Sequence, residues 1–149
     1  MKTGRLNVGV GLLSMAMFMA YGFLLIYLRD FAPDKAQWIA DYGVGRHFEA
    51  RLAHVHGNLF SFLNVGLGFV LAQVSGFDWA RATAAALGLV GLLMPLGIWM
   101  ELYLGASPIF VLIGAISMTS AVALSGALAL RAWGADRPRL PLAPPPQAR

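Results

Sequence analysis

The chain contains no cysteine and few charged residues. Without cysteine it can form neither disulfide bonds nor metal sites built on thiolates. Charged residues occupy 12% of the 149 positions and hydrophobic residues occupy 58%, whereas charged residues make up roughly a quarter of a typical soluble domain. The mean hydropathy is +0.68. This composition argues against a soluble globular domain and predicts a protein embedded in a lipid bilayer.

The apolar residues are concentrated in four long blocks, at about residues 9–28, 52–74, 80–104 and 109–130. Each block reaches the roughly 20 residues that an α-helix needs to cross the hydrocarbon core of a membrane. The sequence therefore predicts an all-α membrane protein with four transmembrane helices in one bundle, which form a single domain over residues 1–131. Residues 132–149 are rich in proline and are expected to form a flexible cytoplasmic tail.

The basic residues are unevenly distributed between the two ends of the predicted helices. With four spans, the N-terminus, the turn near residues 76–81 and the tail share one side. That side carries seven of the eleven lysines and arginines: Lys2, Arg5, Arg81, Arg131, Arg137, Arg139 and Arg149. Because basic residues are retained in the cytoplasm, both termini should face it, and we expect a multi-pass protein of the bacterial inner membrane. The formal net charge of +4 then reflects topology, and no nucleic-acid partner is expected.

Two further patterns concern helix packing. Pro95 has no N–H group to donate to the carbonyl of Gly91, so the third span should be kinked there. In the fourth span, small residues recur along one stripe, where they allow another helix to approach closely: Gly114, Ser117, Ala121 and Ser125.

The second span contains polar residues in an otherwise apolar run: His54, His56, Asn58, Ser61 and Asn64. Polar side chains at membrane depth usually have a partner or line a cavity. Asn58 and Ser61 share the helix face of His54, while His56 points to the opposite face. Two histidines that point apart cannot readily bind one ion. We therefore expect one of them, His54 or His56, to be the metal ligand of a cofactor.

The third span ends on the side where the histidines enter the membrane. Its last residues include Trp99, Glu101 and Tyr103, which can meet the histidines at one depth. Arg46 and Arg51 lie just above, at the headgroup level, where they would pair with the propionates of a haem.

Each of these residues also has a purely structural interpretation. Asn58 and Asn64 would then hydrogen-bond one helix to another. The charged and aromatic residues would anchor helix ends at the membrane interface: Arg46, Arg51, Trp99, Glu101 and Tyr103. We expect His47 to lie in the loop before the second span, with no part in the site.

The segment Glu49-Ala-Arg-Leu-Ala-His54-Val-His56-Gly, within a four-span chain of this size, resembles the styrene oxide isomerase family. Members of that family are small membrane isomerases that bind haem b and assemble as trimers. The resemblance implies that His54 or His56 ligates the haem iron and that the chain forms a homo-oligomer. It also implies that ferric iron acts as a Lewis acid on an epoxide oxygen, after which ring opening and a hydride shift yield an aldehyde.

By the same resemblance, Asn64 and Tyr103 correspond to an asparagine and a tyrosine that complete the pocket of the family. Asn64 lies further from either histidine than in the family, and Trp99 falls nearer the expected tyrosine position. We also expect Glu101 to take part in catalysis. The remaining residues would contact a small hydrophobic substrate: Asn58, Ser61 and Trp99.

Three function classes are compatible with the sequence. The first is a haem-dependent epoxide isomerase. The second is a haem- or metal-binding accessory or electron-transfer protein without isomerase activity. The third is a structural membrane subunit without a cofactor, in which the polar residues only hold helices together.

Overall fold

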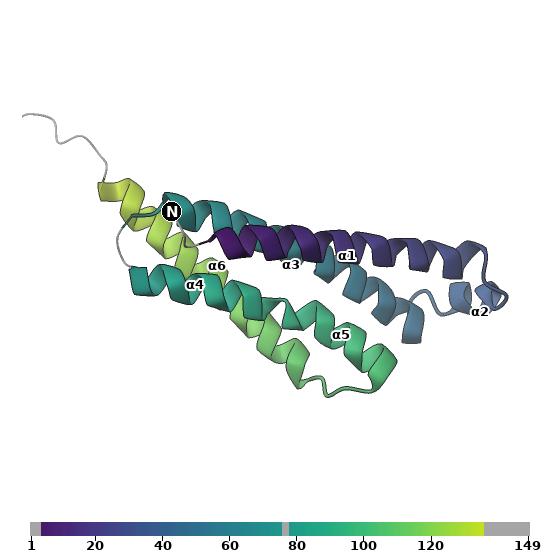
Figure 1. Cartoon of the computed structure of the whole chain (residues 1–149). Coiled ribbons are helices and arrows are strands. Elements are labelled where there is room, and N and C mark those ends of the chain that lie inside the picture. Colours follow the sequence, from purple (N-terminus) through teal and green to yellow (C-terminus); the bar gives the residue numbers. More distant parts are fainter. Residues whose placement is uncertain (1–3, 76–77, 136–149) are drawn as a thin grey trace, which may run out of the picture.

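The computed structural model describes residues 4–75 and 78–135, and within these ranges every regular element is a helix (Figure 1). The helices are α1 (Arg5–Asp30), α2 (Lys35–Ala40), α3 (Gly45–Gln73), α4 (Asp78–Gly91), α5 (Leu93–Leu104) and α6 (Ile109–Ala135). The described residues contain no strand, which confirms the all-α prediction.

Four helical segments are long and apolar enough to cross a membrane, as the hydropathy pattern predicts. They are α1, α3, α4 together with α5, and α6 as far as Ala132. Each segment contains nearly all of its predicted apolar block and extends beyond that block at one end or at both. In particular, α6 continues to Ala135, four residues into the predicted tail, because the next helix-breaking proline is Pro138. Residues 136–149 of that tail lie outside the described residues.

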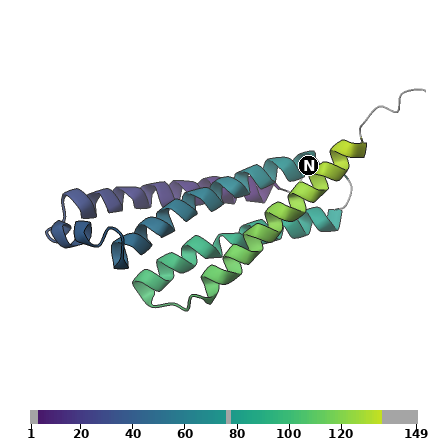
Figure 2. The same cartoon turned by 180° about the vertical axis from the view of Figure 1, so that it is seen from behind.

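The helices pack as two antiparallel pairs. One pair is α1 with α3, and the other is the α4–α5 segment with α6. In Figures 1 and 2, α1 runs alongside α3, and α6 crosses over α4 and α5. Glycines allow the α1–α3 contact: a Cβ atom added to Gly11 would lie 2.8 Å from the carbonyl oxygen of Ser61, and one added to Gly57 would overlap the ring of Phe18. The predicted small-residue stripe of α6 is confirmed, since Ser117, Ala121 and Ser125 are buried and Gly114 faces the backbone of Met94. Close approach of backbones is the main source of packing energy between helices in lipid.

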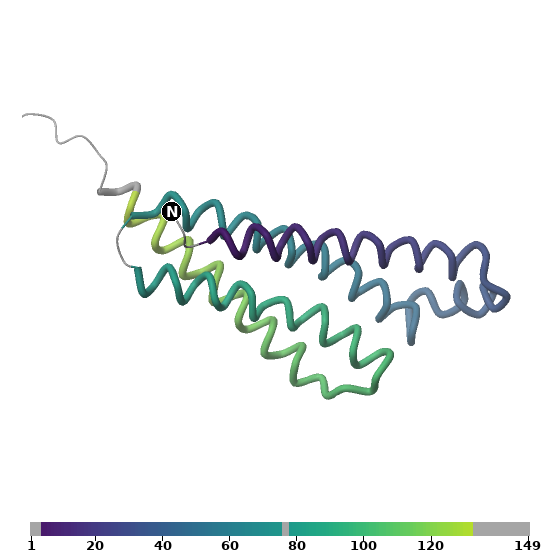
Figure 3. Tube along the Cα trace, in the orientation of Figure 1, coloured from purple at the N-terminus to yellow at the C-terminus, as the bar shows by residue number. Residues whose placement is uncertain are grey.

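The third span is interrupted at Leu92, which separates α4 from α5. Pro95 lies just after this break and cannot donate a hydrogen bond to Gly91, so the predicted kink is confirmed. The trace in Figure 3 shows the change of course between the two helices. As a result α5 contacts α3 and α6, while α4 packs mainly on α6.

A network of side-chain amides joins three helices in the half of the molecule that contains the N-terminus. Asn7 Nδ2 donates to Asn64 Oδ1 (2.9 Å) and to the carbonyl of Ala85 (2.8 Å). Asn64 Nδ2 donates to the carbonyls of Gly88 (2.8 Å) and Phe60 (3.1 Å). Both asparagines are completely buried. The structural interpretation of Asn64, as a residue that hydrogen-bonds one helix to another, is therefore confirmed. Its catalytic role stays a prediction.

The connection between α3 and α4 is held by one arginine. The guanidinium of Arg81 donates from Nε (3.1 Å) and Nη2 (2.9 Å) to the carbonyl of Leu71, near the end of α3. Its Nη1 atom lies 3.0 Å from a carboxylate oxygen of Asp78. Because the last carbonyls of a helix have no partner within the helix, this contact satisfies one of them in a buried position.

The amide network predicts a measurable coupling between α1 and α3. Asn7→Ala should lower the free energy of unfolding by about 1–2 kcal/mol, because it leaves the buried Asn64 Oδ1 without its donor. A double-mutant cycle with Asn64→Ala should give a coupling energy of about 1 kcal/mol. SDS-induced unfolding measures both. Asn58→Ala is the control, since among the described residues Asn58 hydrogen-bonds only within its own helix (2.9 Å to the carbonyl of His54). Additive effects of the two substitutions would contradict the network.

Candidate functional site

His54 is fixed by a hydrogen bond to another helix. Its Nδ1 atom lies 2.8 Å from the carbonyl oxygen of Phe18 in α1, and its ring packs against Gly22. Because a carbonyl oxygen only accepts, Nδ1 must carry the proton, and the neutral ring has a free lone pair on Nε2. Among the described residues, Nε2 makes no hydrogen bond. Metal-ligating histidines are typically oriented in this way, with one nitrogen donating to a carbonyl and the other on the metal.

His56 has different surroundings. Its Nδ1 atom lies 2.9 Å from the carbonyl of Leu52 in the same helix, and its ring meets that of Phe60 edge-on at 6.2 Å. The two imidazoles thus have separate partners, which agrees with the prediction that they point apart. Of these two histidines, His54 is the one that a contact with a second helix orients among the described residues.

Next to His54 lies a pair of tyrosines. The hydroxyl oxygens of Tyr21 in α1 and Tyr103 in α5 are 2.9 Å apart. The Tyr21 ring lies 6.4 Å from the ring of His54, and Trp99 lies 5.1 Å from Tyr103. The structure therefore brings His54, Trp99 and Tyr103 into one cluster through Tyr21, a residue that the sequence analysis missed. The available signal was a tyrosine inside the apolar first span, which also contains the hydroxyls of Ser14 and Tyr27.

A cavity of about 320 Å³ adjoins this cluster. It lies between α1 and α5 and is lined by Met17, Phe18, Tyr21, Leu96 and Trp99. Tyr21 supplies its one polar side-chain group apart from the indole N–H of Trp99. Such a chamber suits a small apolar molecule.

Glu101 lies elsewhere. It is exposed and lines a cavity of about 360 Å³ between α3, α5 and α6, together with Glu49, Leu52 and Met94. The structure therefore places its carboxylate on the face of Met94, as the helical repeat predicts, and in a different cavity from Trp99. Its catalytic role stays a prediction.

The two predicted cofactor arginines do not converge. Arg46 lines a cavity of about 290 Å³ beneath α2, which also includes Asp34, Trp38 and Tyr103. Arg51 instead stacks on the ring of Tyr42, with its Cζ atom 3.7 Å from the ring centre.

Arg51 also donates to the carbonyl of Tyr42 (3.1 Å). It lines a fourth cavity, of about 240 Å³, with Arg29 and His47. Arg51 lies one turn from His54 on nearly the same face of α3, which makes it the closer of the two arginines to that imidazole along the helix.

The other polar residues predicted to belong to the site on α3 lie at different distances from His54 along the helix. Asn58 is half-buried and lies one turn from His54, to whose carbonyl it donates. Ser61 is completely buried under α1 beside Gly11, and among the described residues its hydroxyl has no partner. Asn64 lies about 15 Å further along the helix than His54, given a rise of about 1.5 Å per residue. Asn58 is thus nearer the cluster than Ser61 or Asn64.

The expectation that His47 lies in a loop is wrong. α3 begins at Gly45, so His47 is in its first turn, and it is buried. Its Nδ1 atom lies 2.6 Å from the carbonyl of Trp38, and its ring stacks on the Trp38 indole at 4.5 Å. The apolar block begins only at residue 52, whereas the helix begins seven residues earlier, among polar residues. His47 therefore connects α3 to α2 through this hydrogen bond and this stacked ring.

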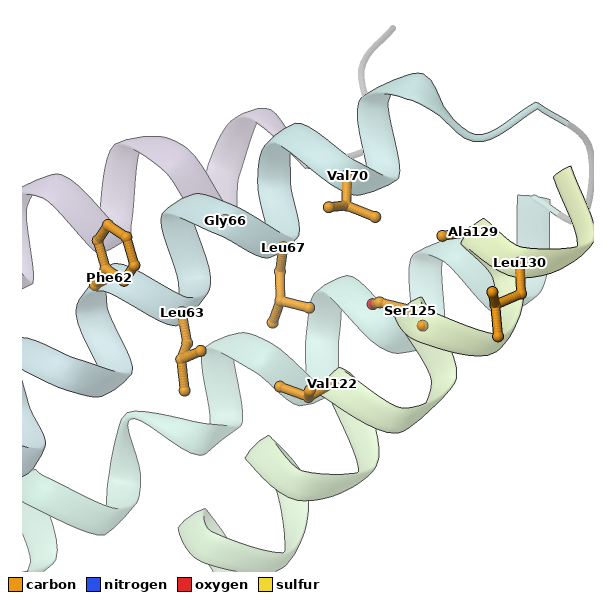
Figure 4. Close-up of a pocket in the computed structure, with 10 residues that line it drawn as sticks. Phe62, Leu63, Gly66, Leu67, Val70, Val122, Ser125, Ala129 and Leu130 are labelled. Carbon is orange, nitrogen blue, oxygen red and sulfur yellow. The ribbon is translucent and has the colours of Figure 1, made fainter. Parts of the chain in front are cut away.

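A longer apolar groove lies at the other end of α3. Figure 4 shows this groove of about 420 Å³ between α3 and α6, lined among others by Leu67, Val70, Val122 and Ser125. Ser125 carries the one side-chain oxygen in its lining. None of the predicted site residues lines it, so it is separate from the cluster around His54.

No protein-family model, curated protein sequence or solved structure matches this chain.

The position of His47 predicts a local effect of its removal. In His47→Ala, α2 loses both the hydrogen bond to its Trp38 carbonyl and the stacked ring. We expect amide hydrogens of residues 35–42 to exchange about tenfold faster, as measured by hydrogen–deuterium exchange with mass spectrometry. His56→Ala should leave that exchange unchanged, because within the described part of the chain the His56 side chain hydrogen-bonds only inside α3. Equal exchange in wild type and His47→Ala would show that α2 is held by other contacts.

Proposed function

We propose that this chain is a multi-pass membrane protein that binds haem b through His54 and converts a small hydrophobic epoxide to an aldehyde. The observation that carries the proposal is the His54 imidazole, whose Nδ1 is held by the carbonyl of Phe18 while Nε2 is left free within an apolar span. The resemblance of the second span to the styrene oxide isomerase family supplies the reaction. The adjoining apolar cavity is consistent with a lipophilic substrate.

The residues around His54 fit a haem in two respects. Gly22 allows the ring to lie directly against α1 and to be held there, since an added Cβ at that position would lie 2.7 Å from Cε1 of His54. Arg51 lies one turn nearer the α2 end, where a second guanidinium, that of Arg29, lines the same cavity. Guanidinium groups at the headgroup level are suited to carboxylates such as haem propionates. We therefore favour His54 over His56 as the ligand, and Arg51 over Arg46 as the propionate partner.

The proposed reaction needs no second substrate. When bound, a ferric haem supplies a Lewis acid for the epoxide oxygen. The bond between that oxygen and the more substituted carbon breaks, and a hydride moves with its electron pair from the neighbouring carbon to the cationic one. The neighbouring carbon then forms the C=O bond of the aldehyde, so all atoms of the epoxide are retained.

The side chains of the protein have two roles in this scheme. The apolar walls of the cavity keep water away from the cationic carbon, which water would otherwise trap as a diol. The indole of Trp99, which forms part of the wall, offers a π-face that stabilises positive charge nearby.

We further propose that the protein lies in the bacterial inner membrane as a homo-oligomer, with both termini in the cytoplasm. The start of α1, the end of α3, the start of α4 and the end of α6 lie at one end of the molecule, opposite α2 (Figure 1). Arg5, Arg81 and Arg131 belong to that end, which supports a cytoplasmic location. Large apolar side chains such as Leu13, Phe23 and Phe62 are exposed on the spans, as lipid or a second copy would require. Trimers are implied by the family resemblance alone.

The proposal is tested by the absorption spectrum and products of the purified wild-type protein. We expect a Soret band and the conversion of styrene oxide to phenylacetaldehyde. His54→Ala should lose the band, and His54→Gly should regain it with added imidazole, which would occupy the vacated ligand position. His56→Ala is the matched control and should retain haem.

The other function classes give different outcomes. Haem without turnover would favour an accessory or electron-transfer role. A colourless wild-type protein without turnover would overturn the proposal and favour a structural subunit.

A further inference from the structure

We infer that Tyr21 is the hydrogen-bond donor for the oxygen atom of a small apolar ligand held in the cavity between α1 and α5. The inference takes the ligand class from the proposed function and deepens it by naming the binding site. It starts from the pair of hydroxyls, Tyr21 and Tyr103, whose oxygens are 2.9 Å apart beside that cavity.

The number of protons in the pair leaves one donor free. Each phenol carries one proton and can both donate and accept. A single hydrogen bond between the two oxygens uses one proton, and the other can be donated to a third group. The pair is only partly buried, so a ligand at its edge can accept that proton.

The surroundings of the two tyrosines decide which proton is free. Tyr103 also lines the polar cavity beneath α2, which contains Arg46, Asp34 and Gln37. In that cavity the Tyr103 oxygen can accept from water or from the guanidinium, which directs its own proton to Tyr21. Tyr21 lines the apolar cavity and then donates into it. Successive hydrogen bonds of this kind polarise one another, so the Tyr21 donor is strengthened.

The lining restricts the ligand to one chemical class. Apart from the Tyr21 hydroxyl and the indole of Trp99, the walls are hydrocarbon and thioether: Met17, Phe18 and Leu96. A charged ligand would find no opposite charge among these residues and would be poorly solvated. A neutral molecule with an apolar body and one accepting oxygen fits both the walls and the donor. Aryl epoxides, aldehydes and ketones belong to this class.

The test uses acetophenone, an unreactive ketone with one ring and one carbonyl, and the full-length protein in lipid nanodiscs. In wild type, infrared spectroscopy should resolve a bound carbonyl band at lower frequency than that of the ketone dissolved in lipid. Tyr21→Phe should lose this band, and the dissociation constant should rise about fivefold, as expected for one neutral hydrogen bond. Tyr27→Phe is the matched control, because Tyr27 lies in the same helix, stacks on Phe31 and is exposed.

Two further variants keep the test decisive. Tyr103→Phe retains the Tyr21 donor without its polarising partner, so the carbonyl shift should become smaller without disappearing. Met17→Trp should fill the cavity from an exposed position and abolish binding while leaving the helical content intact. An unchanged band in Tyr21→Phe, or unchanged binding in Met17→Trp, would overturn the inference.

The outcome is separable from that of the proposed function. If acetophenone binds through Tyr21 to a protein that has neither haem nor isomerase activity, the donor site stands and the enzymatic proposal fails. If the wild type carries haem on His54 and isomerises styrene oxide, but Tyr21→Phe leaves the carbonyl band unchanged, the proposed function stands and the donor site fails.

Discussion

The close approach of α1 to α3 is the constraint on which the other contacts depend. Gly11 and Gly57 allow the two backbones to come near enough for groups on one helix to hydrogen-bond groups on the other. This approach brings the carbonyl of Phe18 to the ring of His54, and the amide of Asn7 to that of Asn64. In hydrocarbon no water can replace these partners, so a polar side chain that lost its neighbour would be left unsatisfied.

The break in the third span has a complementary effect. If α4 and α5 formed one straight helix, the end of α5 would follow the course that α4 sets along α6. The interruption at Leu92 changes the direction of α5, which contacts α3 and carries Tyr103 to Tyr21. The cavity between α1 and α5 lies beside this contact. The break in the third span thus determines where this cavity lies.

The sequence predicts those features that a single helix determines and misses those that depend on its neighbours. Span lengths, the kink near Pro95 and the separate directions of the two histidines follow from composition and helical periodicity. The partners Asn7 and Tyr21 do not, because they depend on the register of α1 against α3 and α5. The assignment of His47 to a loop is also wrong, since hydropathy reports where the apolar residues begin, whereas α3 begins seven residues earlier, at Gly45.

The difference between His54 and His56 shows how neighbours assign roles to identical side chains. Both rings donate Nδ1–H to a carbonyl oxygen and leave Nε2 free, so their chemistry is the same. The carbonyl of Leu52 belongs to the same helix as His56. A hydrogen bond to it therefore cannot fix the His56 ring relative to another helix. The carbonyl of Phe18 holds His54 relative to α1, and with it the distance to Tyr21. A ligand nitrogen is useful only if it is held in place relative to the groups that bind the rest of the ligand. Of the two imidazoles, His54 alone meets that condition through a contact between helices.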